Sequence, residues 1–203
     1  TWDGDDFDTE FVEWCQWLVS RQFTEARRSA PDVAVIGDLA VGVDPAGADA
    51  WAFQDSLALG CRVGAPPDPF SGTGQDWGLP PFNPVALASA RFTPFIETVR
   101  AALRGMSGLR IDHIMGLFRL WCIPPDRPAH EGAYVEMPSQ AMLGILRVEA
   151  YRAGAFLIGE DLGTVPDGVR QAMAASGILG TRVAWFEPEP PTRWPKDCLG
   201  TLT

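Results

Sequence analysis

Arg110 and Asp112 lie two residues apart, and the apolar residues Leu109 and Ile111 alternate with them. This alternation predicts a short strand that places the arginine and the aspartate on the same face. An aspartate at the carboxyl end of a strand, preceded by such a cation, has the features of an ionised nucleophile. A structural salt bridge would show the same spacing, so the pattern alone leaves both interpretations open.

Three further acidic residues, Asp38, Glu160 and Glu187, also follow apolar runs that are typical of buried strands. Helical segments separate these runs, and strands that alternate with helices imply a parallel sheet. The carboxyl ends of parallel strands meet on one face, where the ligand sites of barrels and open α/β sheets form. Acids at such positions also commonly cap the next helix or face solvent, and for Glu187 we prefer that structural role.

The elements that must position these acids follow one another along the chain. Strands are expected at 33–37, 109–112, 155–159 and 181–186, and helices at about 9–28, 46–53, 85–103, 139–152 and 166–176. Ser139 is expected to cap the helix that it begins, and Pro166 to lie in a first helical turn. The segments 59–84 and 124–138 have no periodicity and are predicted to be long loops.

Two converging carboxylates without metal-binding histidines fit glycoside chemistry, in which one carboxylate attacks the anomeric carbon and the other protonates the leaving oxygen. Asp112 suits the nucleophile, because Arg110 on the same face would favour its ionised form. Glu160 suits the general acid/base, because negative charge on Asp161 and Asp112 would raise the pKa of Glu160. A magnesium site built from the same acids is the competing interpretation, although no phosphate-binding glycine loop accompanies it.

The first long loop carries side chains that suit a sugar. Trp77 offers an apolar face to a sugar ring, and Gln75 and Asp76 are able to hydrogen-bond to hydroxyl groups. Trp77 would equally serve to pack the loop onto the core. His113 likewise has two equal interpretations, as a hydrogen-bond donor to substrate or as a buried ring with satisfied hydrogen bonds.

The composition argues against several classes of partner. The net charge of −10 argues against nucleic acid and anionic membranes, and no apolar run reaches the ~20 residues of a membrane span. Only two histidines are present, which argues against a histidine-rich zinc site. The four cysteines form no paired motif and indicate free thiols in a reducing compartment, the cytoplasm, with two disulfides as the alternative. The length of 203 residues suggests one domain or two small ones.

Several of these segments together resemble the amylomaltase family of 4-α-glucanotransferases, glycoside hydrolase family 77, also called disproportionating enzymes. The matching stretches are Ile36-Gly37-Asp38-Leu39-Ala40-Val41-Gly42-Val43, Gly64–Asp68, Gly74–Gly78, Arg110-Ile111-Asp112-His113 and Ile158-Gly159-Glu160-Asp161-Leu162-Gly163. They follow the family's order over nearly the whole chain, and the ordered set is far more specific than any single motif.

The resemblance implies a (β/α)8 TIM barrel, of which residues 1–203 would form the central portion, with about four strands, as a partial catalytic domain. It implies retaining transfer of α-1,4-glucan segments to a glucan or glucose acceptor, without a metal or organic cofactor. It makes Asp112 the nucleophile, Glu160 the acid/base, and Arg110 the residue that positions Asp112. The expected substrate-binding residues are Asp38, Asp68, Gln75, Trp77, His113 and Asp161. The expected partners are α-1,4-glucans, malto-oligosaccharides and the remaining barrel segments of a parent chain.

Family members carry a third acid, an aspartate preceded by a histidine, after a later strand. No His-Asp pair occurs in this sequence, and the expected position lies beyond Thr203. We therefore expect an internal fragment of an amylomaltase-like enzyme that has little or no activity alone. The alternatives are an α-glucan hydrolase of related barrel type and a non-catalytic glucan-binding fragment.

Overall fold

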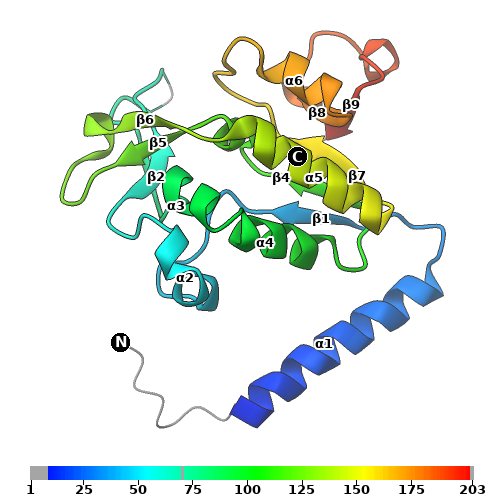
Figure 1. Ribbon diagram of the computed structural model, residues 1–203. Coiled ribbons are helices and arrows are strands. Elements are labelled where there is room, and N and C mark those ends of the chain that lie inside the picture. Colours follow the sequence, from blue (N-terminus) through cyan, green and yellow to red (C-terminus); the bar gives the residue numbers. More distant parts are fainter. Residues whose placement is uncertain (1–8, 70, 202–203) are drawn as a thin grey trace. The chain divides into compact units, whose positions relative to one another are not determined.

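The computed structural model describes residues 9–69 and 71–201, which divide into two compact units on either side of the Val35–Ile36 bond (Figure 1). The first unit contains helix α1 (Thr9–Ser29), which confirms the predicted helix. None of its residues is buried, and the aromatic side chains of Phe11, Trp14 and Trp17 are more than half exposed. Helix α1 therefore has the predicted amphipathic pattern without a core of its own.

The second unit is built around a parallel sheet with the strand order β1-β4-β7-β8-β9. These strands are β1 (Ile36–Leu39), β4 (Gly108–Ile111), β7 (Phe156–Gly159), β8 (Ile178–Val183) and β9 (Cys198–Thr201). Helices α4 (Thr93–Leu103) and α5 (Ser139–Ala153) pack against each other and against the sheet, and α6 (Val169–Ala175) packs against β8 (Figure 1). This arrangement confirms the predicted α/β class with parallel strands.

The central strands are buried on both faces, as expected of parallel strands that helices cover. Leu157 and Ile158 follow each other in β7 and so point to opposite faces, yet neither is more than 4% exposed. Val99 of α4 and Leu146 of α5 are completely buried in the same core. Removing such apolar surface from water stabilises the fold by about 25 cal/mol per Å². The core thereby fixes the strand ends that carry the acids.

A second sheet was not expected from the sequence. It is antiparallel, with the order β3-β2-β5-β6. Its strands are β2 (Arg62–Ala65), β3 (Gln75–Leu79), β5 (Arg119–Ile123) and β6 (Ala133–Glu136). The prediction of long loops at 59–84 and 124–138 was therefore wrong, because three of these strands lie there. Their glycines, polar residues and exposed positions give no clean alternation, and strand pairing stabilises them instead, since β2 and β6 pair with β5 and β3 pairs with β2.

Several predicted boundaries are also corrected. The helix expected at 85–103 is two helices, α3 (Pro84–Ser89) and α4, separated where Arg91 and Phe92 adopt left-handed backbone conformations. Ser139 is the first residue of α5 rather than its cap, and its side chain makes no capping bond there. Pro166 precedes α6, which begins at Val169. The short helix α2 (Ala48–Ala52) lies where a helix was expected.

Two strand shifts change the positions of predicted acids. Strand β1 begins three residues later than expected, so Asp38 lies within the strand and not after it. Strand β8 begins at Ile178 and ends at Val183, and the 3-10 turn 184–186 separates it from Glu187. Of the four acids, Asp112 and Glu160 alone follow their strands directly.

The four cysteines are free thiols, as predicted. Among the helices of the described residues, none has the length and apolar character needed to cross a membrane.

Candidate active site

The ends of β4 and β7 bring Asp112 and Glu160 together. The two strands pair in parallel up to Ile111 and Gly159, so the acids are the next residues of neighbouring strands, which lie ~4.8 Å apart in a sheet. The backbone amide of Asp112 donates to the carbonyl of Leu39 at 2.9 Å, and that of Glu160 donates to Ile111 at 2.9 Å. The sheet thus fixes the backbone of both acids.

Arg110 bridges two carboxylates. Its Nη2 donates to Asp112 Oδ1 at 2.8 Å, and its Nη1 lies 2.7 and 2.8 Å from the two oxygens of Asp38, the residue opposite it on β1. Burial lowers the pKa of Arg110, but both carboxylates raise it and the net shift is upward, so the guanidinium stays charged. The predicted pairing of Arg110 with Asp112 is confirmed.

Glu160 has a different environment. Burial raises the pKa of Glu160, a hydrogen bond from the His113 amide to Oε2 at 2.8 Å lowers it, and the Asp112 charge raises it further, with a net upward shift. The predicted upward direction is confirmed, and Asp112 contributes as expected. Asp161 is not among the causes of this shift, so that part of the explanation was wrong. A carboxyl group that holds its proton more tightly than usual suits an acid/base.

His113 and Trp77 join the two sheets at this point. His113 adopts a left-handed backbone conformation with φ 43°, and its ring meets Trp77 edge to face with centroids 5.2 Å apart. Burial lowers the pKa of His113, opposed by Asp112, so the ring is neutral at pH 7. Trp77 Nε1 donates to Gln75 Oε1 at 3.0 Å. His113 therefore adjoins the acid pair, Trp77 contacts His113, and Gln75 contacts Trp77.

The close pairing of β2 with β3 supports this aromatic contact. Gly64 of β2 lies so near β3 that an added Cβ would collide with the carbonyl oxygen of Gln75. Only glycine permits this approach. The glycine that begins the Gly64–Asp68 stretch therefore helps to set the position of Gln75 and Trp77.

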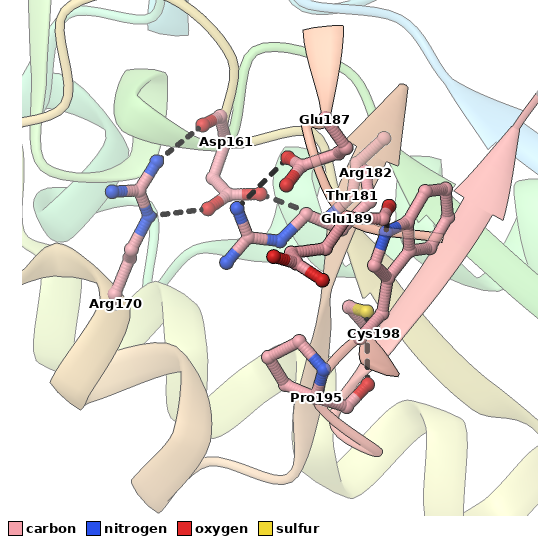
Figure 2. Close-up of polar contacts among 9 residues, drawn as sticks. Asp161, Arg170, Thr181, Arg182, Glu187, Glu189, Pro195 and Cys198 are labelled. Atoms are coloured by element: carbon pink, nitrogen blue, oxygen red, sulfur yellow. Dashed lines mark hydrogen bonds and ion pairs between the residues drawn. The ribbon is translucent and has the colours of Figure 1, made fainter. Parts of the chain in front are cut away.

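Three other acids have local structural partners. Asp68 Oδ1 accepts the Ser71 amide at 2.6 Å and closes its own loop. Asp76 accepts from Arg62 Nε at 2.7 Å and from the Gly78 amide at 3.0 Å. Asp161 is only 6% exposed and binds Arg170 and Thr181 (Figure 2). These contacts favour structural roles for Asp68 and Asp161, which we had expected to bind substrate.

Sequence reasoning missed the pairing of Asp38 with Arg110 and the contacts of Arg170 and Thr181. The first depends on the register of two strands 72 residues apart, which no local pattern reveals. Glu187, for which a structural role was preferred, pairs with Arg182 at 3.0 Å. Across residues 9–69 and 71–201, no three His, Cys, Asp or Glu side chains are grouped to hold a metal ion.

Comparisons with known proteins agree with this geometry. The profile of the family described as 4-alpha-glucanotransferase matches residues 4–203. A 4-alpha-glucanotransferase of Mycobacterium tuberculosis (strain ATCC 25618 / H37Rv) is 46% identical over 208 residues, which cover 96% of this chain and 29% of the relative. A 4-alpha-glucanotransferase of Haemophilus influenzae is 41% identical over 181 residues, covering 87% of this chain and 26% of the relative. The chain thus spans less than a third of these two relatives.

Solved structures give the same result for the fold. Amylomaltase from Corynebacterium glutamicum superposes with a TM-score of 0.90 at 40% identity, covering 100% of this chain and 31% of that one. Amylomaltase from Streptococcus agalactiae in complex with acarbose gives a TM-score of 0.79 at 22% identity, covering 91% and 40%. The predicted fold is confirmed, since the parallel sheet and its helices form part of a (β/α)8 barrel.

Proposed function

The chain belongs to the 4-alpha-glucanotransferase family, glycoside hydrolase family 77, and from this membership we propose that the complete protein transfers α-1,4-glucan segments with retention of configuration. One observation carries the proposal. Asp112 and Glu160 follow neighbouring strands, and one is ion-paired with Arg110 while burial raises the pKa of the other. Two adjacent carboxyl groups with opposite electrostatics are what a retaining glycosidic mechanism requires.

In the first step, a carboxylate oxygen of Asp112 attacks the anomeric carbon of the donor glucan. The bond from that carbon to the glycosidic oxygen breaks, and Glu160 gives its proton to the departing oxygen. Arg110 holds Asp112 Oδ1, which leaves Oδ2 to form the covalent bond. The products are a glycosyl-aspartate and a shortened glucan, and Glu160 is left as a carboxylate.

In the second step, Glu160 accepts a proton from the 4-hydroxyl of an acceptor glucan or glucose. The acceptor oxygen attacks the anomeric carbon, and the bond to Asp112 breaks. Two inversions at one carbon restore the α configuration. Both carboxyl groups return to their starting protonation states, so the cycle needs no metal or organic cofactor.

We assign the sugar contacts to Trp77, Gln75, His113 and Asp38. Trp77 of β3 contacts His113 and Gln75, and the neutral ring of His113 is able to donate to a sugar hydroxyl. The Asp38 carboxylate is 61% exposed although it binds Arg110. It therefore retains lone pairs for a sugar hydroxyl.

The test is incubation of the complete protein with maltotriose, followed by chromatography of the products. Transfer yields glucose together with maltopentaose and longer chains. Hydrolysis yields glucose and maltose without longer chains and would replace the proposal with the hydrolase alternative. A glucan-binding protein would yield no product, although calorimetry would detect binding.

Asp112→Asn tests the residue assignment in the same assay. The variant keeps the size of the side chain and an acceptor for Arg110, so we expect an unchanged circular dichroism spectrum and abolished transfer. The exposed Asp55→Asn is the matched control and should retain full activity. Transfer by the Asp112 variant would remove this residue from the mechanism.

A further inference from the structure

The backbone pairing between β7 and β8 stops before the end of β7. The two strands pair only at Leu157 with Ile178 and at Ile158 with Leu179. Beyond these pairs a side-chain bridge continues the connection. Thr181 Oγ1 donates to the carbonyl of Gly159 at 3.0 Å, and the Thr181 amide donates to Asp161 Oδ1 at 2.8 Å. One threonine thus contacts both residues that flank Glu160.

Asp161 is held firmly while it makes this bridge. Arg170 Nε donates to Asp161 Oδ2 at 2.7 Å, and Arg170 Nη2 donates to the Asp161 carbonyl at 3.1 Å. Figure 2 shows the carboxylate between Arg170 on one side and Thr181 on the other. The buried carboxylate therefore acts as a fixed acceptor in place of a strand carbonyl.

The backbone of Glu160 itself is bound from the opposite side. Its amide donates to Ile111 at 2.9 Å, and its carbonyl accepts from the Ile114 amide at 3.1 Å. Strand β4 and the 3-10 turn Ile114–Leu117 that follows it therefore hold Glu160, whereas Thr181 of β8 holds the residues before and after it. This leaves little freedom for the backbone that carries the acid/base.

We propose that Thr181 and Asp161 are positioning residues for proton transfer by Glu160. This inference rests on the proposed function, in which Glu160 must protonate the donor oxygen and then deprotonate the acceptor at nearly the same place. Proton transfer needs a heavy-atom separation of about 2.6–3.2 Å, and small displacements of a catalytic group reduce rates strongly. Neither positioning residue touches the reacting atoms in this mechanism, and both act through the peptide bonds around Glu160.

The experiment compares two donors in the complete protein. When maltotriose is the donor, the leaving oxygen must be protonated. When α-maltotriosyl fluoride is the donor, fluoride is the leaving group and needs no proton from Glu160. The kcat/KM of each donor reports the steps up to formation of the glycosyl-enzyme, so their ratio isolates the proton transfer. Thr181→Val removes the hydroxyl and keeps the branched shape, Thr181→Ser restores the hydroxyl, and Asp161→Asn keeps an acceptor without the charge.

Thr181→Val is expected to lower kcat/KM for maltotriose roughly 10-fold and to change that for the fluoride less than about twofold. Thr181→Ser should recover most of the maltotriose rate. Asp161→Asn should show the same selective loss at a smaller size, because its amide oxygen still accepts from Thr181. KM for maltotriose should stay nearly constant, since the sugar contacts are intact.

Two control variants separate positioning from stability. Thr98→Val breaks a similar threonine bond, from Oγ1 to the Pro94 carbonyl at 2.9 Å, within α4. Glu149→Gln alters a carboxylate that is also 6% exposed and bound to arginines, between α4 and α5. Both controls should keep the wild-type ratio of the two donors even if they lower the melting temperature.

Equal losses on both donors, or a Thr181→Val variant that behaves like Thr98→Val, would overturn the positioning role. Failure of the proposed function has a different signature. In that case the wild-type protein would form no transfer products from maltotriose: a hydrolase would release fluoride and give only shorter sugars, and a glucan-binding protein would release no fluoride.

Discussion

The carboxyl ends of β4 and β7 are neighbours in one sheet, yet the acids that follow them have contrasting electrostatic environments. Asp112 on β4 has a 37% exposed side chain that is ion-paired with Arg110. Glu160 on β7 is half-buried and receives a backbone amide, and burial is the largest cause of its raised pKa. In the proposed mechanism, the environments, rather than the residue types, distinguish the nucleophile from the acid/base.

The two ends also influence each other. The charge of Asp112 raises the pKa of Glu160, and Arg110 lowers it less strongly. In the proposed mechanism, the Asp112 charge therefore helps Glu160 to hold the proton that the first step consumes. Glycosylation of Asp112 would remove that charge and lower the pKa of Glu160, which favours the carboxylate form that the second step requires.

The largest predicted effect comes from deleting each acid in turn. Asp112→Ala should lower transfer by about 10⁴-fold or more, the size typical of a lost nucleophile. Glu160→Ala should lower transfer from maltotriose by about 10²- to 10⁴-fold but still release a burst of fluoride from α-maltotriosyl fluoride. The measurement is transfer from maltotriose beside fluoride release from the activated donor.

Azide supplies the control for this comparison, because it attacks without losing a proton. In Glu160→Ala, azide should displace Asp112 from the glycosyl-enzyme and give the α-glycosyl azide. In Asp112→Ala, any azide product forms by direct displacement of fluoride and should be the β anomer. Interchanged anomers would reverse the two assignments.

A smaller effect is expected from Arg110→Lys. One ammonium group cannot reproduce two guanidinium nitrogens that bind different carboxylates, so Asp112 and Asp38 would lose their fixed separation. We expect kcat to fall roughly 10- to 100-fold with an unchanged circular dichroism spectrum. Arg100→Lys is the matched control, since Arg100 of α4 binds both oxygens of Glu149 of α5 and neither residue is among the proposed site residues. A similar loss in both variants would mean that the Arg110 contacts are structural.

Sequence patterns were sufficient to predict four of the five strands of the parallel sheet, because burial makes these strands apolar, but β9 was not predicted. The runs at β4 and β7 end at Asp112 and Glu160 in the structure as predicted. The antiparallel sheet could not be read in the same way. Strand β3 has the sequence Gln75-Asp76-Trp77-Gly78-Leu79, which shows no clean alternation, and its partner β2 pairs in turn with β5, a strand that is distant in the chain.

The candidate site was predictable to a similar degree. Residue type and strand position suggested the acid pair and Arg110, and residue type suggested Trp77 and His113 beside an equal structural alternative, between which the resemblance favoured substrate contacts. The partners of Asp38 and Asp161 were not predictable, because they depend on strand register and on a helix that follows the strand. Long-range pairing decides which side chains each acid contacts.

Trp77→Ala should have a more modest effect on catalysis. The variant loses the edge-to-face contact with His113 and the bond to Gln75, and we expect KM for maltotriose to rise about 5- to 10-fold with a smaller change in kcat. Steady-state kinetics measure the two separately. Trp51→Ala is the control, because Trp51 is 73% exposed on α2. An unchanged KM would mean that Trp77 only packs β3 against His113 and does not bind the substrate.

The smallest predicted effect is thermodynamic and concerns Glu160 alone. Its pKa is raised in the folded state, so the folded protein binds this proton more tightly than the unfolded chain does. The associated stability is present at low pH and is lost as pH rises through the pKa of Glu160. Glu160→Gln removes this titration. The stability gain of the variant over wild type should therefore be larger at pH 7 than at pH 4.

We expect the difference in melting temperature to be on the order of 2 °C, which corresponds to less than about 1 kcal/mol in a domain of this size. Calorimetry at both pH values measures it, and an Asp112→Asn background sharpens the comparison. Without the Asp112 charge the pKa of Glu160 should fall, so the gain from Glu160→Gln should shrink but persist, because burial is the larger cause. If the gain vanished entirely in that background, repulsion between the two acids, and not burial, would be what distinguishes the end of β7 from the end of β4.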